Sequence, residues 1–277
     1  MTVERTSLVT FIGPRRAWLS LGLSDVWAYR ELLYFLTVRD LKVRYKQTAI
    51  GVLWAILQPG LSTLIFAVVF SQMSRFDSPG VPYPLLVLSG LLLWLFVNNT
   101  TLFASNSLIG SSDLVTKVYF PRLLLPIAAV SAGIIDLAIG FVMLLIVMAV
   151  YGTGFAASIL LAPLFALQAV LLTLGIGAMM AALNVRFRDV KFALPFALQI
   201  WMFASPVFYP IEILSDRARQ VLSFNPMNGI LSGFRSALFG LPFDRQLISI
   251  SVVVTLVVLA AGSLVFTRME DDFADVI

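Results

Sequence analysis

Long apolar stretches separated by short polar segments constrain this chain of 277 residues more than any other feature of its sequence. A helix crosses the hydrocarbon core of a bilayer with about 20 mainly apolar residues. Stretches of that kind run over residues 52–72, 84–106, 123–151, 158–183, 193–210 and 247–267. We therefore expect an all-α integral membrane protein with six transmembrane helices, forming a single domain over residues 1–277.

The composition disfavours an enzyme. Hydrophobic residues make up 60% of the chain and charged residues only 12%, whereas a soluble domain carries about 25% charged residues. The chain has no His and no Cys, so it lacks the commonest general base, thiol nucleophiles and thiolate metal ligands. A phosphate-binding G-x-x-x-x-G-K-[ST] loop is absent, and the carboxylates are scattered along the chain. We expect neither catalytic residues nor a metal site.

The positions of Lys and Arg predict the orientation of the spans. If the N-terminus is cytoplasmic, the inside segments 1–51, 107–122, 184–192 and 268–277 contain 14 of the 19 basic residues. Cytoplasmic loops of membrane proteins carry an excess of Lys and Arg. The bias therefore predicts a multi-pass protein of the cytoplasmic membrane with both termini in the cytoplasm.

The segment 28–50, which precedes the first span, has the pattern of an amphipathic helix. Tyr34, Val38, Leu41 and Tyr45 recur at helical spacing on one face. The adjoining face is basic and carries Arg39, Lys42 and Lys46. Such a helix lies in the membrane interface with its rings at headgroup depth. It either anchors the first span or docks a cytoplasmic partner.

The link 107–122 between the second and third spans predicts a short helix from about residue 113 to residue 120. Ser111, Ser112 and Asp113 are favourable at a helix start, and Pro121 cannot continue a helix. The candidate contact residues are Val115, Val118 and Tyr119, with Lys117 as the charge. This turn either contacts a partner or lies on the lipid surface.

The link 184–192 between the fourth and fifth spans carries clustered charge. Arg186, Arg188 and Lys191 surround Asp189. These residues either mark the cytoplasmic side with a surface ion pair or belong to a moving part.

The last outside loop, 211–246, departs from an ordinary polar loop. Pro206 and Pro210 break the fifth span just before it, and Asn225 with Pro226 reads as a helix start. Apolar residues follow at helical spacing: Ile230, Leu231, Phe234 and Leu238. Apolar segments of about 10–14 residues are too short to span a membrane but can be re-entrant. We expect re-entrant helices at an outer gate, with an extracellular cap as the alternative.

Polar residues within the spans are few. Asp136 is the one formal charge deep in any predicted span, and Asn98, Asn99 and Thr101 belong to a polar run in the second span. An ionisable residue inside the membrane suggests a functional site, but a lone Asp can also be hydrogen-bonded between helices. The polar run fits helix–helix contacts or a wet pathway equally well.

Five sequence blocks occur in order along the chain. They are VRDLKVRYKQTAIGVLWAILQP, KVYFPRLLLP, NVRFRDV, SPVFYP and FNPMNGI. Together they resemble the membrane subunit of a type-two ABC exporter for polysaccharides, the family that exports O-antigen, capsular polysaccharide and wall teichoic acid as lipid-linked chains. The resemblance covers roughly residues 28–270.

The resemblance implies a homodimeric permease joined to two copies of a separate ATPase. ATP and Mg²⁺ would bind the ATPase, so this chain would need no cofactor. The matching interface helix carries Arg39, Asp40, Lys42, Arg44, Tyr45 and Lys46. The matching coupling helix carries Asp113, Lys117, Tyr119, Phe120, Pro121 and Arg122. Arg186, Arg188 and Asp189 match a cytoplasmic gate region, and residues 211–240 match the outer gate helices.

A polymer path would then lie between two copies of the chain. Its candidate aromatic platforms are Trp54, Phe70, Trp201, Phe208 and Tyr209, and its candidate polar residues are Asn98, Asn99 and Thr101. Two other functions remain open at this point: a related ABC permease for a small amphipathic drug or antibiotic, and a membrane enzyme acting on lipid-linked sugars. The enzyme would need paired acid and base carboxylates near the headgroups.

Overall fold

A computed structural model describes residues 23–46, 51–70, 81–210 and 215–273. These residues form α-helices and short 3₁₀ turns, with no β-sheet among them. The predicted all-α class is therefore confirmed for this part of the chain.

Four helices among the described residues are long and apolar enough to cross a membrane. They are α4 (Tyr83–Asn106), α6 (Leu124–Tyr151), α7 (Ala162–Arg186) and α11 (Arg245–Met269). The 24 residues of α4 rise by about 36 Å at ~1.5 Å per residue, which exceeds the ~30 Å hydrocarbon core. These helices coincide with the predicted second, third, fourth and sixth spans.

Two further apolar helices are shorter than predicted. Helix α3 (Trp54–Phe70) has 17 residues, and the predicted end of its span at residues 71–72 lies outside the described residues. Helix α8 (Val190–Phe203) has 14 residues, whereas the predicted fifth span runs over residues 193–210. Residues 204–210 are non-helical, because a residue before proline is pushed out of the helical region.

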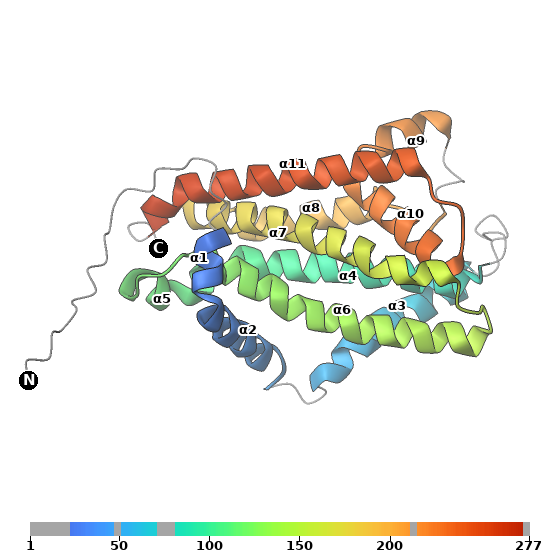
Figure 1. Ribbon diagram of the computed structural model, residues 1–277, viewed down its shortest axis with the longest axis horizontal. Coiled ribbons are helices and arrows are strands. Elements are labelled where there is room, and N and C mark those ends of the chain that lie inside the picture. The colour runs from blue at the N-terminus through green and yellow to red at the C-terminus, as the bar shows by residue number, and fades with distance from the viewer. Residues whose placement is uncertain (1–22, 47–50, 71–80, 211–214, 274–277) are drawn as a thin grey trace, which may run out of the picture.

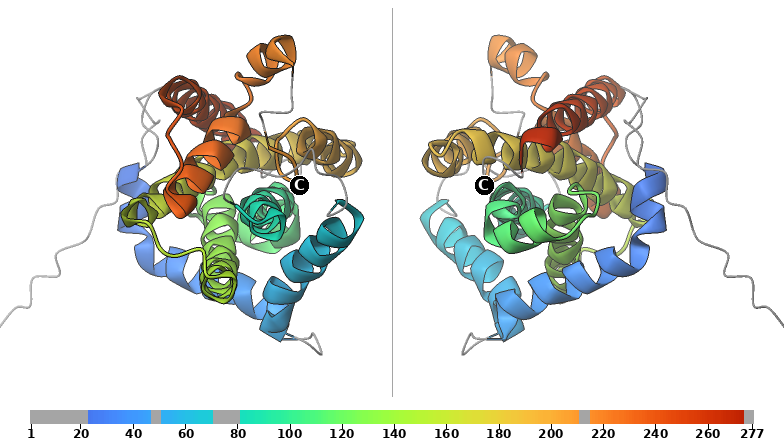
Figure 2. Two further views of the ribbon diagram at one scale, coloured as in Figure 1. Left: turned by 90° about the vertical axis from the view of Figure 1, so that its right-hand side faces the viewer. Right: turned by 90° about the vertical axis from the view of Figure 1, so that its left-hand side faces the viewer.

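Helix α4 lies in the middle of the bundle, as the end-on views of Figure 2 show. Within the most apolar window of each helix, 78% of the residues of α4 are buried inside the chain, against 28% for α6 and 22% for α11. Helices α6, α7 and α10 (Pro226–Phe239) pack around α4 and share its largest hydrophobic core.

Helices α7 and α11 approach each other closely through glycine. A Cβ atom on Gly262 would collide with the carbonyl oxygen of Gly175, and a Cβ atom on Gly175 would collide with the backbone of Leu259. Gln168 also donates from α7 to the hydroxyl of Ser251 in α11 at 2.8 Å. Small residues let membrane helices pack backbone to backbone, so these positions fix the α7–α11 pair.

The two ends of the bundle carry different elements (Figure 1). One end, which we name the α5 end, carries α1 (Leu23–Ala28), α5 (Ser112–Lys117) and the end of α11. The opposite end, which we name the α10 end, carries α10 and α9 (Asp216–Leu222). Helix α2 (Arg30–Tyr45) runs from the α5 end along the outside of the bundle and, with α3, forms an arm beside α4 and α6 (Figure 2).

The 3₁₀ turns lie at or beside helix ends. They are η1 (Gly51–Leu53), η3 (Ile109–Ser111), η4 (Ala157–Leu161) and η6 (Glu270–Asp272).

Candidate functional site

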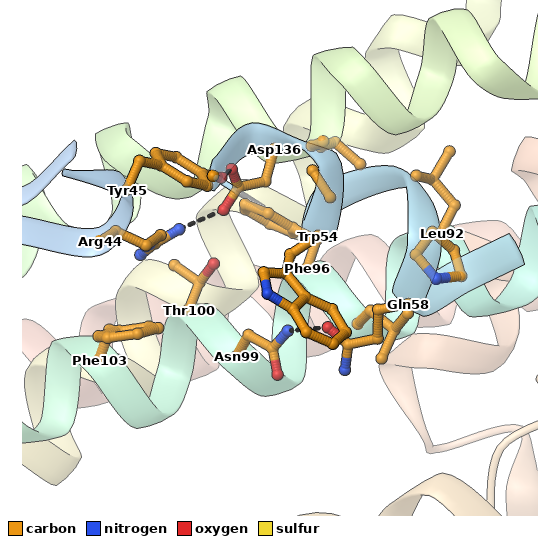
Figure 3. A pocket seen from close by; sticks show the side chains of 15 residues that line it. Arg44, Tyr45, Trp54, Gln58, Leu92, Phe96, Asn99, Thr100, Phe103 and Asp136 are labelled. Carbon is orange, nitrogen blue, oxygen red and sulfur yellow. Dashed lines mark hydrogen bonds and ion pairs between the residues drawn. The ribbon is translucent and has the colours of Figure 1, made fainter. Parts of the chain in front are cut away.

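A cavity with a few polar side chains in a mostly apolar wall opens between α2, α3, α4 and α6, where the arm meets the bundle (Figure 3). Its volume is about 230 Å³. Its walls comprise Arg44, Tyr45, Gly51, Trp54, Ala55, Gln58, Pro59, Leu92, Leu95, Phe96, Asn99, Thr100, Phe103, Asp136 and Leu137. The cavity thus brings together an ion pair, two carboxamides and several rings from segments far apart in the sequence.

The carboxylate of Asp136 is paired with α2. Arg44 and Tyr45, at the end of α2, both donate to this carboxylate (Figure 3). The Arg44 side chain is 13% exposed and the Asp136 side chain 27% exposed. The guanidinium of Arg44 also lies 4.2 Å from the ring centroid of Phe103. Asp136 therefore makes the interhelical bond that was one of its two possibilities, and this bond joins α6 to the end of α2.

The opposite wall of the cavity carries two carboxamides. Asn99 Nδ2 donates to Gln58 Oε1 at 3.4 Å, and Asn98 Nδ2 donates to Asn99 Oδ1 at 3.0 Å. The indole of Trp54 lies close to this pair in the view of Figure 3, and the residue is 49% exposed. Two predicted pathway residues, Trp54 and Asn99, therefore share one cavity with Asp136.

The basic residues of α2 divide into two kinds. Arg39 donates to Asp40 at 2.9 Å and to the hydroxyl of Ser111 in η3 at 3.2 Å, so it ties α2 to the link that follows α4. Lys42 and Lys46 are exposed. Arg39, whose side chain is 37% exposed, is paired with Asp40, whereas the described residues show no ion pair for these two lysines.

The predicted coupling helix is shorter than expected. Helix α5 ends at Lys117, and Val118 is extended, with φ −127° and ψ 134°. Tyr119 and Val118 are 80% and 52% exposed, whereas Val115 is buried at 3%. Val115 therefore packs inside the chain and does not belong to the contact surface. Lys117 donates to Asp113 at 2.6 Å on the exposed side.

The end of the coupling segment is bound to the C-terminal part of the chain. The backbone N–H of Arg122 donates to Glu270 Oε1 at 3.0 Å, and the Arg122 guanidinium donates to the Glu270 carbonyl oxygen. Phe120 and Pro121 are buried beside this junction. Sequence reasoning grouped these residues with the contact surface, but burial leaves Tyr119 and Val118 as its exposed apolar part.

The predicted cytoplasmic gate residues lie between α7 and α8. Arg186, Arg188 and Asp189 are all exposed, and no ion pair joins them in the part of the chain that the structure describes. Arg186 lies 5.8 Å from the ring centroid of Phe187. The expected surface ion pair of Asp189 is therefore not formed in this structure.

An aromatic cluster occupies the α10 end of α3 and α8. Phe208 stacks on Phe66 of α3 with ring centroids 4.9 Å apart, and it lies edge-on to Phe203 and Tyr209. Three predicted residues, Trp201, Phe208 and Tyr209, lie at this end and are half-buried. These three predicted lining residues therefore lie apart from Trp54 and Asn99, which line the cavity.

Asn225 joins the start of α10 to the end of α8. Its Oδ1 accepts from the Met227 N–H at 3.0 Å, as expected of a helix start, and from Trp201 Nε1 at 2.9 Å. Its Nδ2 donates to the Ala204 carbonyl oxygen and the Ser205 hydroxyl. The predicted helix start at this residue is confirmed.

Sequence reasoning missed Arg235, which lies in α10 and is 8% exposed. Its guanidinium donates to the carbonyl oxygens of Pro206, Val207 and Leu86 at 2.8, 2.7 and 3.0 Å. Gly90 makes room for this contact, because a Cβ there would collide with Arg235 and Val207. Non-helical backbone at membrane depth needs such partners, and Arg235 supplies them for the broken end of α8. The signal in the sequence was a lone Arg within an apolar helix.

Asn98 and Thr101, two predicted lining residues, are not part of the cavity wall or of the aromatic cluster. Thr101 is fully buried within the chain. The side chain of Phe70 lies outside the described part of the structure.

These features define a helical membrane protein whose polar groups join helices and line a cavity. The described residues contain no cluster of three or more acidic side chains that could hold a metal. A model of the ABC-2 type transporter family matches residues 31–239, which is most of the chain, and the protein belongs to that family.

Several relatives match over almost their full length. The O-antigen export system permease protein RfbA of Myxococcus xanthus is 30% identical over 91% of this chain and 97% of its own. A protein of the same name from Klebsiella pneumoniae is 25% identical over 89% and 95%. The polysialic acid transport protein KpsM of Escherichia coli is 23% identical over 85% and 92%.

Proposed function

We propose that this chain is the permease subunit of an ATP-driven exporter that moves a lipid-linked, O-antigen-like polysaccharide across the cytoplasmic membrane. The observation that carries the proposal is the 30% identity to a permease named for O-antigen export, across 97% of that protein. Two relatives from a second organism carry the same name. The names favour a polysaccharide over a small drug as the cargo.

A separate ABC ATPase would supply the energy. The chain has no phosphate-binding loop, and the α5 end presents Tyr119 and Val118 to the surroundings. Among the described residues, these two apolar side chains are free of contacts that would prevent a partner from covering them. The ATPase, with its ATP and Mg²⁺, would bind at the α5 end, which would then be cytoplasmic.

Six spans and a second copy of the chain would complete the pathway. Helices α3 and α8 would cross as the first and fifth spans, with residues 204–210 continuing the path of α8 and α10 entering from the outer side. Both helices carry exposed apolar side chains. Those of α3 include Leu61, Leu64, Ile65 and Val68, and those of α8 include Phe192, Phe196, Ile200 and Phe203. A homodimer would bring these faces together around a path that includes the aromatic cluster.

The test of this function is an ATPase copurification. Lys117→Glu combined with Tyr119→Ala should prevent the ATPase from purifying with the permease and should stop glycan from reaching the cell surface. Arg217→Glu combined with Phe224→Ala, two exposed residues at the α10 end, is the matched control for ATPase binding and should leave copurification unchanged. Normal copurification and export in the first double variant would contradict the coupling role.

A further inference from the structure

We propose that the cavity between α2, α3, α4 and α6 binds one neutral sugar unit of the transported glycan. The proposal rests on the polysaccharide function proposed above and adds a site and a charge preference to it. It depends on the size of the cavity, its two exposed rings, its two carboxamides and its charge balance.

The size of the cavity suits a single sugar ring. Its volume of about 230 Å³ equals that of roughly eight water molecules at ~30 Å³ each. The rings of Trp54 and Phe103 in its wall are 49% and 50% exposed. Aromatic faces of this kind can contact the apolar C–H face of a pyranose. The cavity is open on one side, so it would hold one unit while the rest of the chain lies outside it.

The carboxamides offer the donors and acceptors that sugar hydroxyls need. Each carboxamide has two N–H donors and one carbonyl acceptor. Gln58 is exposed, and its Nε2 donates to no other residue that the structure describes. The 3.4 Å separation between Asn99 Nδ2 and Gln58 Oε1 is long for a hydrogen bond. A sugar hydroxyl could replace this bond at little cost.

The charge balance of the cavity favours a neutral ligand. Its one guanidinium, Arg44, is paired with the carboxylate of Asp136 and stacked over Phe103. An acidic sugar or a phosphate would have to compete with Asp136 for this cation while facing the same carboxylate, and like charges brought together are unfavourable.

A single cysteine in the cavity wall can report on ligand binding. The chain has no native Cys, and Ala55 lines the cavity. The Ala55→Cys variant of the full chain in lipid nanodiscs would react with a water-soluble maleimide. Neutral dextran oligosaccharides should slow this reaction several-fold. Oligogalacturonate of matched length and inorganic pyrophosphate should not.

Variants of the carboxamides test the assignment directly. Gln58→Leu and Asn99→Leu, each combined with Ala55→Cys, should raise the half-protecting dextran concentration about tenfold. Gln199→Leu, which removes an exposed carboxamide from α8 outside the cavity, is the matched control and should not. Because Gln58 is exposed, its replacement tests the site even if Asn99→Leu fails to fold.

Three results would overturn the proposal: no protection by dextran, equal protection by oligogalacturonate or pyrophosphate, or unchanged protection in both carboxamide variants. A second measurement, the amount of glycan on the surface of cells that lack the permease gene, distinguishes failure of this site from failure of the proposed function. Normal surface glycan there would refute export while leaving the measured sugar binding in place. Lost surface glycan without dextran protection would refute the site alone.

Discussion

The guanidinium of Arg235 in α10 donates to the carbonyl oxygen of Val207, 28 residues earlier in the chain, at 2.7 Å. The same group holds Pro206 and Leu86, so one buried side chain joins α10, α4 and the broken end of α8. Phe208, the centre of the aromatic cluster, is the next residue after Val207. The arrangement of the α10 end therefore depends on Arg235.

Replacing Arg235 by Gln should loosen this end of the molecule. Each carbonyl left without a partner costs about 1–3 kcal/mol, so thermal unfolding in detergent should shift to lower temperature, and a cysteine at Tyr209 should react faster with a water-soluble maleimide. Arg235→Lys should lie in between, because it keeps the charge without the planar fork. Arg245→Gln removes an exposed charge at the start of α11 and should change neither measurement. If Arg235→Gln unfolds and reacts like the parent, Arg235 does not hold the α10 end.

The pair formed by Arg44 and Asp136 predicts coupled stability effects. Arg44→Gln and Asp136→Asn should each lower the free energy of unfolding, since each leaves a partly buried charge without its partner. The double variant should lose less than the sum, with a coupling energy of about 1–3 kcal/mol. Thermal or denaturant unfolding of the parent, the two single variants and the double variant measures this coupling energy. Additive losses would mean that the two side chains act independently.

The exposed lysines of α2 predict a dependence on anionic lipid. Each cation near an anionic leaflet contributes about 1 kcal/mol, so Lys42→Gln with Lys46→Gln should weaken export. The defect should be largest with anionic lipid at low salt and should shrink as salt is raised or anionic lipid is removed, because the parent then loses the same attraction. Arg39→Gln should instead disturb the contact between α2 and Ser111, with little dependence on lipid charge. Vesicles of graded anionic content, with the partner ATPase present, provide the measurement. Equal export at every lipid composition would leave the lysines as markers of topology.

The glycine contact between α7 and α11 predicts a packing defect. Gly262→Ala should lower the free energy of unfolding by about 1–3 kcal/mol, because the added Cβ would force the backbones of α7 and α11 apart. Gly110→Ala is the matched control, since a Cβ at Gly110 meets no atom within 4 Å. Unfolding curves of both variants in the same detergent decide the matter. Similar curves for the two would argue against a tight α7–α11 contact.

Hydropathy and helix-terminus patterns predicted the local features of the fold well. The long apolar stretches coincide with α4, α6, α7 and α11, and Asn225 begins α10 as its sequence indicated. The predicted length of the coupling helix was wrong, because the chain becomes extended at Val118 although the sequence carries no breaker before Pro121. Val115 was predicted to contact a partner but is buried in the chain. An apolar residue in a short helix can face either a partner or the core of its own chain, and its sequence does not distinguish the two.

The sequence alone determined that this is a helical membrane protein, since a helix satisfies its own backbone hydrogen bonds in lipid and needs only enough consecutive apolar residues. The tertiary structure alone decided that Asp136 pairs with Arg44, 92 residues away, and that Arg235 supports the end of α8. The physical reason is that lipid-facing and helix-facing side chains are both apolar in such a protein. Hydropathy therefore marks where a helix crosses but not which neighbour each face meets, and long-range polar contacts become visible only when the helices are packed.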